Sequence, residues 1–170
     1  ELTISGARPT IAATAHARQN NRQTFAALLR VYPELEPGRL LADLLVASPG
    51  QEGRWFATAV SLRFYALAAE IAGRSPCDPR TLVRAGTQRL AADPEFAGEV
   101  ALAALASICG GYGVEITGED VFAAYDLAHQ ATLRTGGQAR LRAQVAALCD
   151  QPHPAAQWVH GLPAPELTGR

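Results

Sequence analysis

Apolar residues recur at helical spacing along most of the chain, in seven segments separated by short breaks. The clearest apolar stripe is formed by four residues at positions i, i+3, i+4 and i+7: Phe25, Leu28, Leu29 and Tyr32. This periodicity predicts helices over residues 11–31, 38–47, 52–72, 79–92, 94–109, 118–134 and 138–149. We expect residues 114–116 to be extended, residues 1–10 to be loose and the proline-rich tail 151–170 to be irregular.

Two of the predicted helices begin with the same signal, an aspartate followed by a proline. Asp78-Pro79 and Asp93-Pro94 each provide a capping side chain and then a residue suited to the first helical position. Two others end at paired glycines, Gly110-Gly111 and Gly136-Gly137. The helix at 94–109 contains most of an uncharged run that extends from residue 100 to residue 114. We therefore predict that it is the buried central helix.

The composition favours the same fold class. Alanine (34 residues) and leucine (20 residues) are the commonest amino acids, and both are strong helix formers, whereas β-branched and aromatic residues are sparse. The chain has 170 residues, of which 48% are hydrophobic, and this is enough to bury a core. These features predict an all-α, single-domain helical bundle of about six to seven helices that covers residues 1–170.

Charge is segmented along the chain, although the net charge is only −1. Residues 93–126 contain seven acidic residues and no basic one, and the segments on either side are rich in arginine. One interpretation is that the acidic segment pairs internally with its arginine-bearing neighbours. The other is a bipolar surface that binds a partner, for which the candidate residues are Glu115, Glu119 and Asp120.

Several broad classes of protein are disfavoured. All 15 basic residues are arginine, a composition typical of a GC-rich genome, and the near-neutral charge provides no overall attraction to nucleic acid or acidic membranes. No apolar run reaches the roughly 20 residues that a membrane helix needs. Three cysteines, Cys77, Cys109 and Cys149, form no CxxC motif. Together with the absence of a signal-peptide pattern, these features predict a cytoplasmic protein with buried thiols.

Residues 67–90 resemble a helix-turn-helix motif with an insertion between its helices. The residues that match this pattern are Gly73, Ser75, Thr81, Leu82 and Arg84. The resemblance implies that the second helix directs four polar residues toward base edges and phosphates, namely Arg80, Thr81, Arg84 and Gln88. The predicted turn from Gly73 to Pro79 is longer than the usual turn of about three or four residues. We therefore favour the alternative, two packed helices of which the second has a solvated polar face.

Other candidate sites are weaker. Asp126 and His129 have the spacing of half a carboxylate–histidine metal motif, and Glu95 and Glu99 could add carboxylates from the preceding helix. We favour a packing role for the histidine, on an apolar face with Val121, Phe122 and Tyr125, and a helix-dipole role for the two glutamates. The glycine-rich segment 110–113 follows a helix, whereas a dinucleotide-binding loop follows a strand. We therefore expect no metal and no cofactor.

No motif indicates an enzyme. The sequence accordingly favours a non-enzymatic helical interaction module, an adaptor or regulatory subunit that binds a macromolecular partner. The alternative is a DNA- or RNA-binding protein that uses the helix-turn-helix-like segment 67–90.

Overall fold

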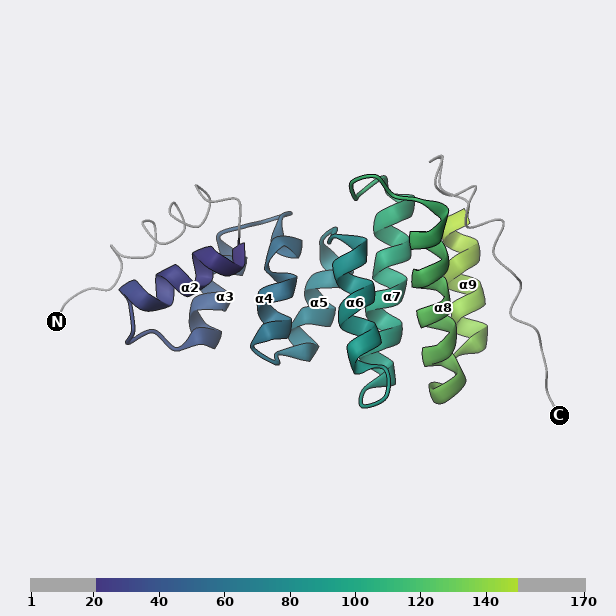
Figure 1. Ribbon diagram of the computed structural model, residues 1–170, viewed down its shortest axis with the longest axis horizontal. Coiled ribbons are helices and arrows are strands. Elements are labelled where there is room, and N and C mark those ends of the chain that lie inside the picture. The colour runs from purple at the N-terminus through teal and green to yellow at the C-terminus, as the bar shows by residue number, and fades with distance from the viewer. Residues whose placement is uncertain (1–20, 150–170) are drawn as a thin grey trace. The chain divides into compact units, whose positions relative to one another are not determined.

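The computed structural model describes residues 21–149 (Figure 1). The elements in this range are α2 (Asn21–Val31), α3 (Pro37–Val46), the 3-10 helix η2 (Glu52–Trp55), α4 (Phe56–Ser61), α5 (Tyr65–Arg74), α6 (Pro79–Arg89), α7 (Pro94–Cys109), α8 (Gly118–Thr135) and α9 (Gln138–Cys149). No strand occurs in this range, so the predicted all-α class is confirmed. The predictions for residues 1–10 and 151–170 lie outside the described residues.

Contacts between residues divide the chain into two compact units, residues 1–75 and residues 76–170. The first unit contains α2 to α5, and the second contains α6 to α9. Each unit has buried apolar residues of its own. That residues 1–170 form a single domain stays a prediction.

The core of the first unit is built around Trp55. This side chain is fully buried, and its indole Nε1 donates a hydrogen bond to Oγ of Ser48 at 3.2 Å. Ser48 is also buried, so the two polar groups satisfy each other away from water. The other large residues buried in this unit include Leu40, Leu41, Leu44, Phe56 and Ile71.

The prediction of one continuous helix over residues 52–72 is wrong, because the structure divides this segment into η2, α4 and α5. The break between α4 and α5 is a Schellman motif. The amide of Phe64 donates to the carbonyl of Ala59, and the amide of Arg63 donates to the carbonyl of Val60. Arg63 occupies the left-handed position with a φ of 63°. Glycine usually marks this position, so the arginine left the break without a signal in the sequence.

The second unit is organised around α7, as predicted for this segment. The helix begins at Pro94, after Asp93 accepts a hydrogen bond from the amide of Phe96 at 3.1 Å, and it ends at Cys109. It packs against both α6 and α8, and α9 packs against α7 and α8 (Figure 1). Buried residues surround much of its circumference, and they include Ala97, Val100, Ala101, Ala104, Leu105 and Ile108.

Small residues let the helices of the second unit approach closely. Gly86 in α6 faces Val100 in α7 and Leu127 in α8. A Cβ atom on Gly86 would lie 2.7 Å from Cδ2 of Leu127 and 2.8 Å from Cγ2 of Val100, both inside van der Waals contact. The neighbouring core cluster of α7 and α8 is also rich in alanine, with Ala97, Ala101, Ala128 and Ala131.

The connection between α7 and α8 differs from the prediction. Residues 114–116 are not a simple extended segment, because Glu115 has a left-handed φ of 50°. The connection begins with a second Schellman motif, in which Gly111 has a φ of 77° and the amide of Tyr112 donates to the carbonyl of Ser107. The chain therefore leaves α7 through a tight turn, and it adopts a second left-handed conformation at Glu115 before it enters α8.

Candidate functional site

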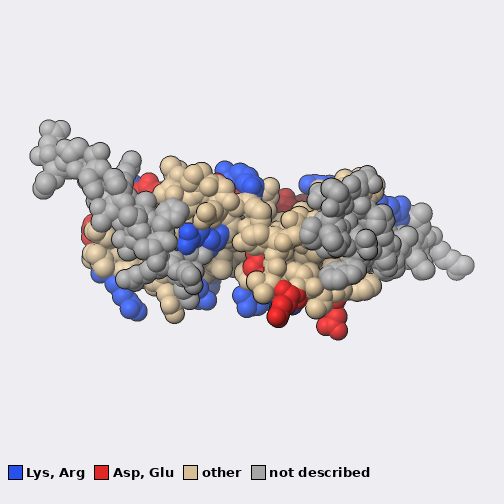
Figure 2. Space-filling model, turned by 90° about the horizontal axis from the view of Figure 1, so that it is seen from above, with Lys and Arg blue, Asp and Glu red and all other residues tan. Residues whose placement is uncertain are grey.

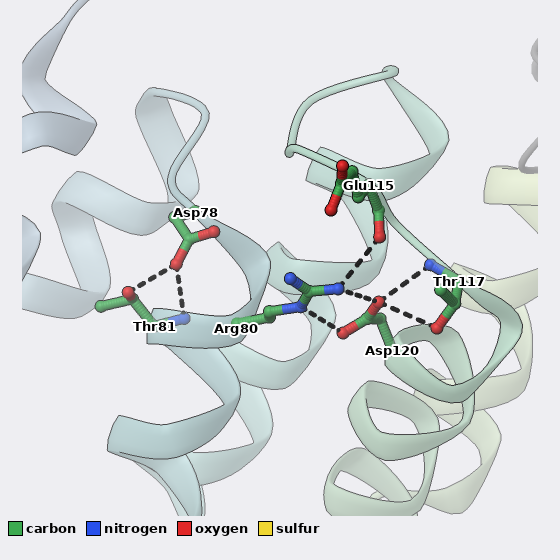
Figure 3. A network of polar contacts seen from close by, with 6 residues as sticks. All are labelled: Asp78, Arg80, Thr81, Glu115, Thr117 and Asp120. Atoms are coloured by element: carbon green, nitrogen blue, oxygen red, sulfur yellow. Dashed lines mark hydrogen bonds and ion pairs between the residues drawn. The ribbon is translucent and has the colours of Figure 1, made fainter.

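The N-terminus of α6 is fixed by its own residues. One carboxylate oxygen of Asp78 accepts hydrogen bonds from both the amide of Thr81 at 2.9 Å and the hydroxyl of Thr81 at 2.5 Å (Figure 3). This confirms the N-cap that the Asp-Pro sequence predicts. Because its hydroxyl is engaged in the cap, Thr81 is a poor candidate for contact with a base or a phosphate.

Arg80, the next candidate on α6, lies against the start of α8. Its Nε donates to Oδ1 of Asp120 at 2.7 Å, and its Nη2 donates to Oδ2 of the same carboxylate at 3.0 Å (Figure 3). Nη2 also donates to the backbone carbonyl of Glu115 at 3.0 Å. The guanidinium therefore makes a two-point pair with one side chain and a further bond to the α7–α8 connection.

Asp120 is fixed from the other side by Thr117. Its Oδ2 accepts hydrogen bonds from the amide of Thr117 at 2.8 Å and from the hydroxyl of Thr117 at 3.1 Å. Hydrogen bonding from Arg80 is the main cause that lowers the pKa of the Asp120 carboxyl to about 2, and bonds from Thr117 contribute. The same pair raises the pKa of Arg80. Asp120 is therefore ionised at neutral and mildly acidic pH, and it is occupied within the chain.

This network joins one residue from each of the two candidate sets. Arg80 belongs to the proposed nucleic-acid set and Asp120 to the proposed partner-binding set, and the structure pairs them with each other. For this pair of residues, the acidic segment pairs with an arginine-bearing neighbour within the chain. The other two acidic candidates differ, because Glu115 and Glu119 are exposed and neither carboxylate makes a hydrogen bond or an ion pair with any described residue.

Three large apolar side chains close to these two glutamates in the sequence are exposed. Tyr112 is 49% exposed, Val114 is 79% exposed and Phe122 is 53% exposed. Phe122 lies one turn after Glu119 on α8, so the two side chains are neighbours on the helix surface. We refer to Tyr112, Val114, Glu115, Glu119 and Phe122 as the α7–α8 surface.

The sequence interpretation missed the apolar members of this surface. It placed Phe122 on an inward face with Val121 and Tyr125, whereas only the last two are buried. Val121 and Tyr125 are four residues apart and share the inward face, and Phe122 follows Val121 by about 100° of helical rotation. An explicit helical projection that began at Val121 would have placed Phe122 outside.

The remaining candidates on α6, Arg84 and Gln88, are exposed and lie one turn apart. Neither side chain makes a hydrogen bond or an ion pair within residues 21–149. Leu82, which the resemblance also matched, is fully buried. Residues 75–78 separate α5 from α6, a shorter connection than the sequence indicated, because α5 continues through Gly73 to Arg74. The two helices belong to different compact units.

The weak metal candidates do not converge. Asp126 accepts a hydrogen bond from Nε2 of Gln130 at 2.6 Å, and the ring of His129 stacks on Tyr125 with centroids 6.3 Å apart. Among the described residues, no group of three or more His, Cys, Asp or Glu side chains is arranged to hold a metal ion. On the face drawn in Figure 2, acidic and basic side chains are scattered between larger areas of neither.

Burial makes the thiol of Cys77 a poor nucleophile. Cys77 and Cys109 are both buried. Burial, with a smaller contribution from the charge of Asp78, raises the pKa of the Cys77 thiol to about 12. At neutral pH this thiol is protonated, whereas nucleophilic chemistry and metal ligation both require the thiolate.

Within the part of the chain that the structure describes, no helix is both long and apolar enough to cross a membrane. Comparisons with protein-family models, with curated proteins and with solved structures found no match to this chain.

Proposed function

We propose that the chain is a non-enzymatic interaction module, an adaptor or regulatory subunit, that binds a protein partner through the α7–α8 surface. The observation that carries this proposal is the exposure of Tyr112, Val114 and Phe122 near two exposed acidic side chains that make no hydrogen bond or ion pair with the described residues. Exposed apolar side chains that gather beside polar ones are typical of interaction sites, whereas scattered single ones are ordinary.

The chemistry of the surface defines the kind of partner. Aromatic and aliphatic side chains supply contact area, and the carboxylates of Glu115 and Glu119 favour a partner segment that carries arginine or lysine. Asp120 does not take part directly, because its carboxylate is already bound by Arg80 and Thr117. The acidic part of the surface is therefore smaller than the three residues that the sequence indicated.

Quantitative affinity capture with the purified full chain tests this proposal. The bait is compared with two double variants, Val114→Ser with Phe122→Ser and Glu115→Lys with Glu119→Lys. We expect each to reduce the recovery of a specific partner by about tenfold, because apolar anchors and complementary charge contribute separately to binding. Purified partner and isothermal titration calorimetry then give the affinity directly.

The matched control is Glu99→Lys, which reverses an exposed acidic residue on α7 outside the α7–α8 surface. It should leave recovery unchanged. Equal recovery by the wild type and both double variants would contradict the proposal, and so would clear substrate turnover by the purified chain alone in a panel of enzyme assays.

Nucleic-acid binding through α6 is the second candidate. It is supported by Arg84 and Gln88, whose exposed side chains make no hydrogen bond or ion pair with the part of the chain that the structure describes. It is weakened at Arg80, which would have to leave Asp120, and at Thr81, whose hydroxyl serves the cap. Fluorescence polarisation with random-sequence duplex DNA and single-stranded RNA at low salt tests it. Arg84→Ala should weaken binding and reduce the salt slope by about one, and no binding by the wild type removes this candidate.

A further inference from the structure

We propose that Arg80 is a positioning residue, whose guanidinium holds the α7–α8 connection in the one shape that presents Tyr112, Val114 and Glu115. The importance of Arg80 for partner binding rests on the proposed function. The ordering of the α7–α8 connection by Arg80 does not depend on a partner. Arg80 thus joins α6 to α8 and to the α7–α8 connection, and we call this contact the clamp. This role differs from nucleic-acid binding, which the sequence suggested for Arg80, and from partner binding, which it suggested for Asp120.

The connection needs an external contact in its middle. Its first part is held by the bond from Tyr112 to the carbonyl of Ser107, and its last part by the bond from Thr117 to Asp120. Between them, residues 113–116 make a single hydrogen bond with the described part of the chain, and its donor is Nη2 of Arg80. The acceptor is the carbonyl of Glu115.

That carbonyl belongs to the residue whose backbone is least favourable. Glu115 has a φ of 50°, a left-handed conformation that residues with a Cβ atom adopt only when their surroundings hold them. Glutamate does not have the tolerance of glycine or asparagine for this region. The bond from Arg80 therefore acts at the position where the loop would otherwise relax first.

The geometry of the guanidinium makes this action specific. Asp120 is fixed by Thr117, and its two oxygens orient the planar guanidinium of Arg80 before Nη2 reaches the carbonyl (Figure 3). A lysine ammonium at the same position is a point charge without a planar fork. It could approach Asp120 but could not reproduce the two-point pair together with the bond to Glu115.

A second packing contact agrees with this role. A Cβ atom on Gly113 would lie 3.3 Å from Cδ of Pro79, so the first residue of α6 lies directly against the connection. Pro79 is buried there, next in sequence to Arg80. The start of α6 therefore both packs against the loop and carries the clamp.

Hydrogen exchange of the Thr117 amide, measured by NMR on the purified full chain, tests the clamp. Arg80→Ala should accelerate this exchange by about tenfold, because charged hydrogen bonds that close the local structure are lost. Cleavage after Glu115 by a glutamate-specific protease should rise by a similar factor. Asp120→Asn, which retains the shape of the side chain and removes its charge, should also accelerate cleavage.

The control is Arg84→Ala, which removes an exposed arginine one turn away and should change either rate by less than about twofold. Arg80→Lys should recover only a small part of the protection. Unchanged exchange and cleavage in both Arg80→Ala and Asp120→Asn would overturn the clamp, and full protection in Arg80→Lys would overturn the role of the guanidinium fork. These readouts need no partner, so a failure of the clamp is distinguishable from a failure of partner capture by the surface variants.

Discussion

The two compact units differ at two kinds of position, a left-handed helix end and a glycine within a helix. In the second unit, Gly111 occupies a left-handed helix end and Gly86 lies in a close contact between helices. In the first unit, the equivalent left-handed helix end is Arg63, whereas Gly73 lies within α5 with no atom within 4 Å of the position a Cβ would take. At these two kinds of position the second unit has the glycines that its backbone and packing require. The first unit has an arginine at the end of α4, and its glycine within α5 is not required by packing.

The same helix-end geometry can be easy or hard to predict from the sequence, because its left-handed position can be a glycine or another residue. Both α4 and α7 end in a Schellman motif with the same pair of hydrogen bonds. Only α7 carries the glycine that makes the motif visible in the sequence. Substitutions of Gly86 and Gly111 by alanine should destabilise the second unit. Substitutions of Gly73 by alanine and of Arg63 by glycine should stabilise the first unit.

Gly86→Ala should have the largest effect. The added methyl group would meet Val100 and Leu127, which are buried and have little room to move, so overpacking should destabilise the second unit by about 1–3 kcal/mol. Hydrogen exchange of the amides in α6, α7 and α8 measures this loss without depending on whether the two units unfold together. Wild-type protection in this variant would show that the helices separate easily and would remove the contrast with Gly73.

Gly111→Ala should destabilise the second unit by about 1 kcal/mol, because alanine at a φ of 77° brings its Cβ against the backbone. The loss should appear as faster exchange at the C-terminal end of α7, and urea unfolding should give its overall size. An unchanged exchange rate would mean that this helix end adopts another conformation at little cost.

Gly73→Ala should stabilise the first unit by about 0.5–1 kcal/mol. Alanine has a better helix propensity than glycine, and nothing surrounds the new methyl group. Fluorescence of Trp55, the buried tryptophan of the first unit, follows urea unfolding of this unit when Trp158 is replaced by phenylalanine in both proteins. A loss of stability would indicate that α5 does not continue through residue 73.

Arg63→Gly should have the smallest effect, a stabilisation of about 0.5 kcal/mol. Relief of the left-handed strain is partly offset by the greater freedom of glycine in the unfolded chain. The side chain of Arg63 is exposed and makes no hydrogen bond or ion pair in the described range, so the substitution removes neither. Arg63→Ala is the control, because it shortens the side chain and retains the strain. If both variants have the same stability, the backbone at this position is not under strain.

Much of the second unit was predictable from local signals. The Asp78-Pro79 and Asp93-Pro94 starts and the glycine at the end of α7 each act through neighbouring backbone groups, so they work without knowledge of the fold. The bounds of the central helix were therefore correct to the residue. The break at Arg63 was not predictable in this way, because arginine adopts that conformation only when the surrounding structure imposes it.

The candidate site also has features that follow from local sequence and features that depend on tertiary packing. The all-α class, the segmentation of charge and the presence of Glu115 and Glu119 near the start of a helix follow from the amino-acid sequence alone. The pairing of Asp120 with Arg80, 40 residues earlier in the chain, and the exposure of Phe122 depend on the packing of the helices. Composition and periodicity record which residues can form a helix and which carry charge. Pairing between distant side chains depends on how the helices pack, and that packing is set by close contacts such as those of Gly86.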